Sequence, residues 1–138
     1  MTLLGICSGG VEEAAEARAA FRRADAINLR QKTYDPEVAW QYVQFLKRFG
    51  QDAEVQSMVG EILERVPGFG QAHLERAKYF DRAGQSAKAV EAAQLALQSA
   101  GNDLTMERDA HWILRRSFTA LGETGNAARE QAWIETHP

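Results

Sequence analysis

The stretch VAWQYVQFLKRFGQDAEVQSMVGEILERVPGFGQAHLERAKYFDR, residues Val38 to Arg82, contains one complete helix-turn-helix unit and the first half of a second. Two short segments, Phe49-Gly50-Gln51 and Ala83-Gly84-Gln85, each close one predicted helix and open a turn. Their glycines lie 34 residues apart, a period typical of helical solenoids. The spacing therefore predicts an all-α protein built from repeated helix pairs.

Local signals predict where the helices begin and end. Asp35-Pro36-Glu37 joins a capping residue, a first-turn proline and an acid that complements the helix dipole, so a helix is expected over Pro36 to Phe49. Asp52 is expected to cap a second helix, which Pro67-Gly68 ends. The other expected helices cover Val11 to Arg30, Gln71 to Ala83, Ala87 to Ser99 behind a capping Ser86, Thr105 to Leu121, and a last segment from about Ala127.

The N-terminal segment, residues 1–34, is expected to act as a capping element. Ser8-Gly9-Gly10 is interpreted as a flexible break, and Phe21 and Ile27 as inward-facing residues of the helix that follows. Three repeats are expected over residues 35–68, 69–103 and 104–138, in one structural domain. The third unit carries an insertion of about four residues, because Gly122 follows Gly84 by 38 residues.

Composition narrows the classes of function. The 16 Lys and Arg against 19 Asp and Glu interleave along the chain, so no nucleic-acid partner is expected. No apolar run approaches the length of a membrane span. The single cysteine, Cys7, cannot form an internal disulfide, which is compatible with a cytoplasmic location. A lipid anchor on Cys7 is the alternative, and bulky Ile6 argues against it.

The repeats resemble the tetratricopeptide repeat family, whose unit is a 34-residue helix pair. Large apolar residues stand four positions before the turn glycines Gly50, Gly84 and Gly122: Leu46, Phe80 and Phe118. Smaller residues follow those glycines by five positions: Val55, Ala89 and Ala127. Pro67 takes the family's terminal proline position. The resemblance covers Pro36 to about His137 and implies a right-handed α-solenoid behind an N-terminal helix.

Two residues of the third repeat depart from the family pattern. Arg115 falls where a small residue lets the two helices approach, and Gln131 where a large apolar residue is usual. The third repeat is therefore expected to be splayed, or Arg115 to reach a carboxylate on a neighbouring helix.

No residue pattern indicates catalysis or metal binding, and no cofactor is expected. His73 and His111 occupy equivalent positions in successive repeats, about 8–10 Å apart by the spacing of packed helices, which is too far to ligate one ion. Both are interpreted as structural residues near helix starts. A nucleophilic Cys7 would need a base, and nothing in the sequence places His73 or His111 near it. No glycine-rich phosphate loop followed by a lysine is present.

The first helix of each repeat presents one position that, by the resemblance, faces a concave groove. Trp40, Leu74 and Trp112 hold this position, and they are expected to form an exposed apolar stripe, although both Trp residues could instead fill the core. The expected partner-binding residues are Trp40, Gln41, Gln44, Lys47, Leu74, Glu75, Lys78, Trp112 and Arg116.

These features predict a non-catalytic protein-binding module, an adaptor, scaffold or chaperone, that takes a peptide or partner helix in the groove. The cations Lys47, Lys78 and Arg116 favour a partner with some acidic residues. The alternative is a structural segment of a larger array that self-associates through its ends.

Overall fold

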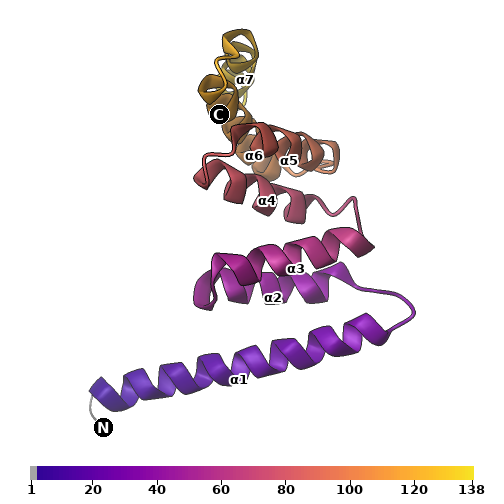
Figure 1. Ribbon diagram of the computed structural model, residues 1–138, viewed down its shortest axis with the longest axis vertical. Helices are drawn as coiled ribbons and strands as arrows, with labels where there is room; N and C mark the ends of the chain where they lie inside the picture. The colour runs from indigo at the N-terminus through magenta and orange to yellow at the C-terminus, as the bar shows by residue number, and fades with distance from the viewer. Residues whose placement is uncertain (1–2) are drawn as a thin grey trace. The chain divides into compact units, whose positions relative to one another are not determined.

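The protein is all-α, as expected (Figure 1). The computed structural model describes the backbone of residues 3–138 and the side chains of residues 11–138, and this part of the chain contains no strand. Its helices are α1 (Leu3–Arg30), α2 (Pro36–Phe49), α3 (Asp52–Arg65), α4 (Gly70–Arg82), α5 (Ser86–Gln98), α6 (Leu104–Ala120) and α7 (Thr124–Thr136). None of the described helices combines the length and apolarity that a membrane span needs.

By their internal contacts the residues form two compact units, Met1–Met58 and Val59–Pro138. The boundary lies inside α3 and does not coincide with an expected repeat boundary. The single structural domain stays a prediction.

In the N-terminal unit, α1 packs against α2 through aromatic side chains. The Phe21 ring lies 5.9 Å from that of Tyr42, in a stacked arrangement, and 5.1 Å from that of Phe45. Ile27, expected to face inward, is exposed. The neighbouring Asn28 is buried instead. Its side-chain amide is satisfied there, because it donates to the Asp35 carbonyl at 2.7 Å and accepts from the Asp35 N–H at 2.8 Å.

The expected break at Ser8-Gly9-Gly10 is wrong, because the backbone of α1 continues through it from Leu3. Glycine weakens a helix by about 1 kcal/mol relative to alanine, which does not by itself end one. The anchor proposed for Cys7 concerns a side chain outside the described residues.

The predicted bounds of α2 are confirmed, and Asp35 caps it by accepting from the Glu37 N–H at 2.9 Å. Asp52, however, is the first residue of α3 and not its cap. The side chain of Glu54 reaches back to the Gln51 N–H at 3.1 Å, which is half of a capping box. Ser86 is likewise the first residue of α5, after Gln85.

In the C-terminal unit, α4 packs on α5, α5 on α6, and α6 on α7, while α4 also lies beside α6. Alanine supplies much of the core of this unit, which lets helices approach closely. The buried cluster includes Ala77, Ala89, Ala93, Ala96 and Ala110 around Leu114. Ala93 is fully buried.

The turns α4–α5 and α6–α7 have the same geometry. Gly84 and Gly122 have φ of 75° and 77°, a left-handed conformation that favours glycine. Gln85 N–H and Glu123 N–H each donate at 2.9 Å to a carbonyl five residues earlier, as in a Schellman motif. Gly50 differs, with φ of −110°; there a Cβ would meet Leu46 Cδ2 at 2.9 Å. The three turn glycines are therefore not equivalent.

Candidate functional site

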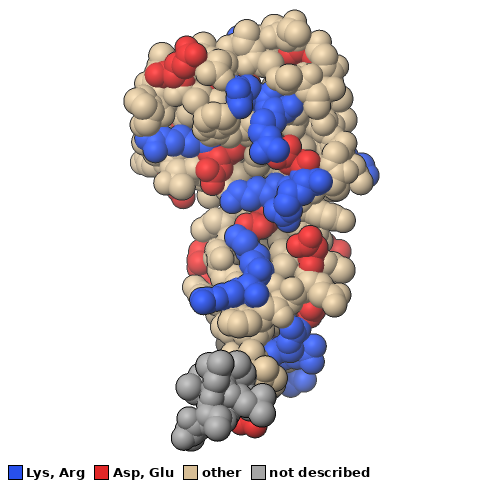
Figure 2. Space-filling view, turned by 90° about the vertical axis from the view of Figure 1, so that its left-hand side faces the viewer, with Lys and Arg blue, Asp and Glu red and all other residues tan. Residues whose placement is uncertain are grey.

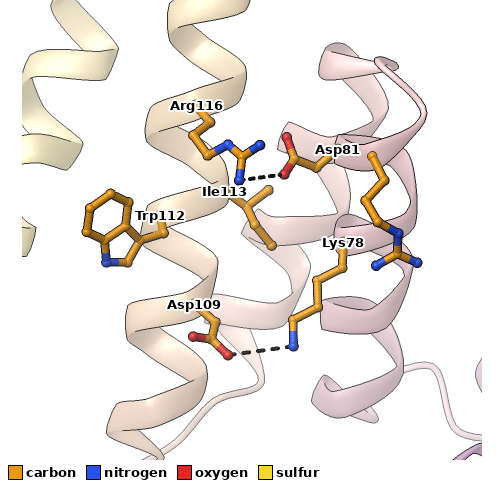
Figure 3. Close-up of a pocket in the computed structure, with 7 residues that line it drawn as sticks. Lys78, Asp81, Asp109, Trp112, Ile113 and Arg116 are labelled. Atoms are coloured by element: carbon orange, nitrogen blue, oxygen red, sulfur yellow. Dashed lines mark ion pairs between the residues drawn. The ribbon is translucent and has the colours of Figure 1, made fainter. Parts of the chain in front are cut away.

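A pocket of about 360 Å³ lies between α4 and α6 in the C-terminal unit (Figure 3). Helix α4 contributes Lys78, Asp81 and Arg82, which share a face because they are spaced three and four residues apart. Helix α6 contributes four residues that share a face by the same three- and four-residue spacing: Asp109, Trp112, Ile113 and Arg116.

Two ion pairs connect the helices across this pocket. Lys78 Nζ lies 3.6 Å from Asp109 Oδ2, and Arg116 Nη1 lies 3.5 Å from Asp81 Oδ2. The pairs have opposite polarity, so each helix presents both signs of charge. Because these distances are longer than those of good charge-assisted hydrogen bonds and the groups are partly exposed, each pair contributes little to stability.

Most of the surface drawn in Figure 2 is uncharged, and the Lys and Arg side chains that lie on it have Asp and Glu side chains beside them.

Trp112 is the one large apolar side chain of the pocket that is exposed, at 44%. The guanidinium carbon of Arg115 lies 4.4 Å from the centre of its ring, a cation–π contact. Arg115 in turn donates from Nη1 to Gln131 Oε1 at 3.1 Å. The two departures from the repeat pattern thus contact each other, and the carboxylate expected opposite Arg115 is replaced by an amide.

Of the residues expected to bind a partner, Lys78, Trp112 and Arg116 come together in the pocket. The expected exposed stripe is wrong, because Trp40 is 9% and Leu74 8% exposed. The remaining expected residues do not line the pocket: Glu75 is buried on α4, and Gln41, Gln44 and Lys47 are exposed on α2 in the N-terminal unit.

Asp81, Arg82, Asp109 and Ile113 line the pocket without having been expected there. Asp81 and Asp109 lie three residues from Lys78 and Trp112, on the same helix faces, so helical spacing from the expected residues was a usable signal.

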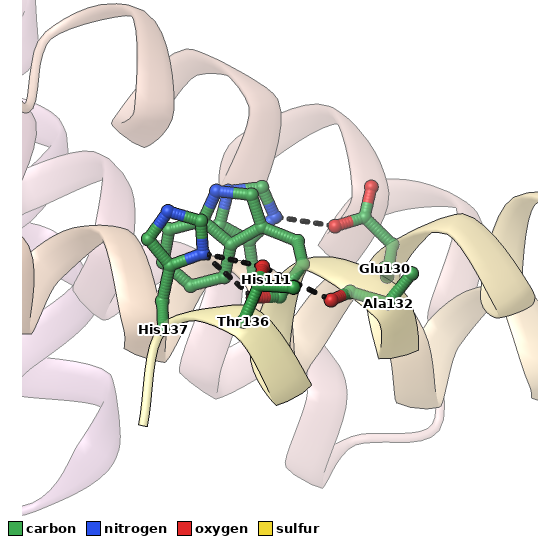
Figure 4. A network of polar contacts seen from close by, with 6 residues as sticks. His111, Glu130, Ala132, Thr136 and His137 are labelled. Atoms are coloured by element: carbon green, nitrogen blue, oxygen red, sulfur yellow. Dashed lines mark hydrogen bonds and ion pairs between the residues drawn. The ribbon is translucent and has the colours of Figure 1, made fainter.

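A second cluster joins α6 to α7 (Figure 4). The His111 ring stacks on Trp133 with centres 3.8 Å apart, and its Nδ1 contacts Glu130 Oε2. His137 stacks on Trp133 at 4.1 Å, and its Nδ1 lies 2.8 Å from the Trp133 carbonyl. The contacts of His111 hold α7 against α6, while those of His137 lie at the end of α7 itself.

His73 is buried on α4, where its Nε2 lies 2.6 Å from the Pro67 carbonyl oxygen. This contact ties the start of α4 to the preceding turn. Among the described side chains, no group of three His, Cys, Asp or Glu could hold a metal ion.

Comparison with protein-family models, with characterised proteins and with solved structures gives no significant match. The pocket between α4 and α6 is therefore the basis for assigning a function.

Proposed function

We propose that the chain is a non-catalytic protein-binding module, which takes a peptide or partner helix at the pocket between α4 and α6. The observation that carries the proposal is Trp112, an exposed aromatic side chain flanked by charges of both signs. Tryptophan and arginine are the residue types that most often dominate binding energies at protein interfaces, and Arg116 lies one turn from Trp112.

We further propose that the pairs α2–α3, α4–α5 and α6–α7 are tetratricopeptide-like repeats in a right-handed array. The matching turns at Gly84 and Gly122 support this arrangement for the last two pairs. The proposed role is that of an adaptor, scaffold or chaperone in the cytoplasm. Self-association through the array ends is the alternative role.

The charges of the pocket refine the expected partner. Because Lys78 and Arg116 already face Asp109 and Asp81, an acidic partner alone would compete with the protein's own carboxylates. A partner with both an acidic and a basic residue beside an apolar one offers an opposite charge to Lys78 and Arg116 and also to Asp81 and Asp109. This proposal adds a basic residue to the partner with some acidic residues that the sequence predicts.

The test is selection of peptides from a displayed random library on the intact chain, followed by titration calorimetry of the peptides recovered. Trp112→Ala should weaken binding by about 30-fold or more, which corresponds to about 2 kcal/mol. The control is Leu95→Ala, since Leu95 is similarly exposed, at 42%, but lies on α5 outside the pocket. Failure to select peptides, or equal affinity for the Trp112→Ala variant, would contradict the proposal.

A further inference from the structure

We propose that the occupant of this surface is a second copy of the chain, with the two α6 helices packed antiparallel about a twofold axis. The inference rests on the proposed protein-binding function and specifies its partner. It is carried by one row of side chains on α6, Asp109, Trp112 and Arg116, which we call the α6 row.

The spacing of the α6 row makes it self-complementary. Asp109 and Arg116 are seven residues apart, which is two helical turns and about 10.5 Å along the axis. In an antiparallel pair whose centre lies between Trp112 and Ile113, Asp109 faces Arg116 of the second copy, and Arg116 faces Asp109 of the second copy. A parallel pair would instead place like charges opposite each other.

A twofold interface requires a surface that complements itself, because both copies present the same patch. The α6 row has this property, with an acid at one end, a base at the other and Trp112 at the middle. A central aromatic residue surrounded by polar groups is also the usual arrangement of a binding hot spot.

The charges of the α6 row remain accessible despite their contacts within the chain. The Arg116 side chain is 63% exposed and that of Asp109 44% exposed, whereas their partners Asp81 and Lys78 are more buried, at 16% and 34%. In the pair of helices, Asp109 would lie between Lys78 of its own copy and Arg116 of the other. Asp109 of each copy would then have two basic neighbours, and in this register no residue of the α6 row faces a like charge of the other row.

A contact centred on two helical turns is small, so we expect a weak dimer that forms with rising concentration. Stable interfaces bury about 1,200–2,000 Å², and smaller ones belong to transient complexes. Sedimentation equilibrium from about 10 µM to about 1 mM covers the affinities that such a contact gives.

The decisive experiment uses two charge reversals, Asp109→Arg and Arg116→Asp, separately and mixed. Each variant alone presents two like charges in its α6 row, so each should dimerise at least about tenfold more weakly than the wild type. A 1:1 mixture presents opposite charges, and heterodimers should form with about wild-type affinity. A partner that is not a second copy gives no reason for the mixture to associate.

Matched controls carry the same charge changes away from the row: Glu91→Arg on α5 and Arg129→Asp on α7, both at exposed positions. Circular dichroism checks the fold of every variant. If a reversal unfolds the chain, Trp112→Ala tests the same surface and should weaken the dimer by about 30-fold. A monomeric wild type at the highest concentration, a mixture that stays monomeric, or a dimer unaffected by these changes would overturn the proposal.

The outcome separates this inference from the proposed function. A monomer that binds selected peptides through Trp112 would overturn the homodimer alone. A monomer from which no peptide is recovered would overturn both.

Discussion

At the scale of single residues, positions that the sequence predicts to be equivalent have different environments. Trp40 and Trp112 stand at the same offset from Leu46 and Phe118, yet Trp40 is 9% and Trp112 44% exposed. Residue type and spacing are the same at both sites. Only the packing of neighbouring helices separates a core residue from a surface residue.

This difference predicts opposite effects of two substitutions. Trp40→Ala should lower the free energy of unfolding by about 3–5 kcal/mol, the usual cost of truncating a buried aromatic side chain. Trp112→Ala should change stability by less than about 1 kcal/mol, because the side chain is already partly hydrated. Urea denaturation followed by circular dichroism measures both. Equal losses would show that Trp112 is part of the core.

A second residue-scale prediction concerns Glu54. Arg18 Nη1 donates to Glu54 Oε2 at 2.5 Å, and the Gln51 N–H donates to Oε1. These hydrogen bonds hold the pKa of this carboxyl below its ordinary value of 4.5. A lowered native pKa stabilises the fold above the unfolded pKa, and this contribution is lost as pH falls through the native pKa. Glu54→Gln should therefore be less stable than wild type at pH 7, and the difference should shrink below about pH 5.

Thermal unfolding of both proteins from pH 7 to pH 3 checks this. The control is Glu64→Gln, which changes an exposed carboxyl on the same helix. A stability difference for Glu54→Gln that did not vary with pH would refute the electrostatic explanation.

At the scale of elements, the α6–α7 pair accommodates two polar residues where the repeat pattern has small and apolar ones. Arg115 and Gln131 are half-buried and hydrogen-bond to each other, while Arg115 Nε is buried without a partner. Gln131 also donates to Glu135 Oε1 at 3.0 Å. Losing one partner leaves the other without its hydrogen bond, whereas replacing both with apolar groups can be nearly neutral.

Arg115→Met and Gln131→Leu should each destabilise the protein by about 1 kcal/mol, while the double variant should lose less than the sum. Guanidinium denaturation of the four proteins measures the coupling energy. Strictly additive losses would mean that the two side chains do not stabilise α6–α7 through each other.

The α4–α5 turn gives another element-scale prediction, because its geometry requires a left-handed residue. Gly84→Ala should cost about 1–2 kcal/mol, since a Cβ is strained at a φ of 75° even though it would meet no atom within 4 Å. Gly68→Ala is the control, because its Cβ also has open space and its φ is not positive. Thermal melts compare the two, and equal stabilities would contradict the turn geometry.

At the scale of the whole chain, the protection of backbone amides from hydrogen exchange is expected to differ among helices of the same unit. No residue of α7 is buried and its main packing partner is α6, whereas α5 packs on both α4 and α6. Native-state hydrogen exchange should therefore be fastest in α7 and slowest in α5 and the middle of α6. Exchange resolved by residue measures this, and protection of α7 equal to that of α5 would contradict it.

Helix boundaries could be predicted from the sequence because the interactions that set them are local. Asp35 caps α2 by accepting a hydrogen bond from the Glu37 N–H, two residues away, and Pro36 is the first residue of the helix. Gly84 forms the turn after α4 through its own left-handed backbone conformation. The failures at Asp52 and Ser86 were shifts of one residue, whereas α1 begins at Leu3, eight residues before the predicted Val11. Local chemistry thus determined the all-α class and nearly every element.

The candidate site depended on the tertiary structure, because it is made of contacts between residues far apart in the chain. Lys78 meets Asp109, and Arg115 meets Gln131, only when the helices are rotated and spaced as this packing requires. Side-chain periodicity restricts which residues share a helix face, but not how far each face is covered by its neighbours. The sequence by itself therefore determined the helices and proposed Trp112, while only the packing of the helices buried Trp40 and Leu74 and brought Asp81 and Asp109 into the pocket.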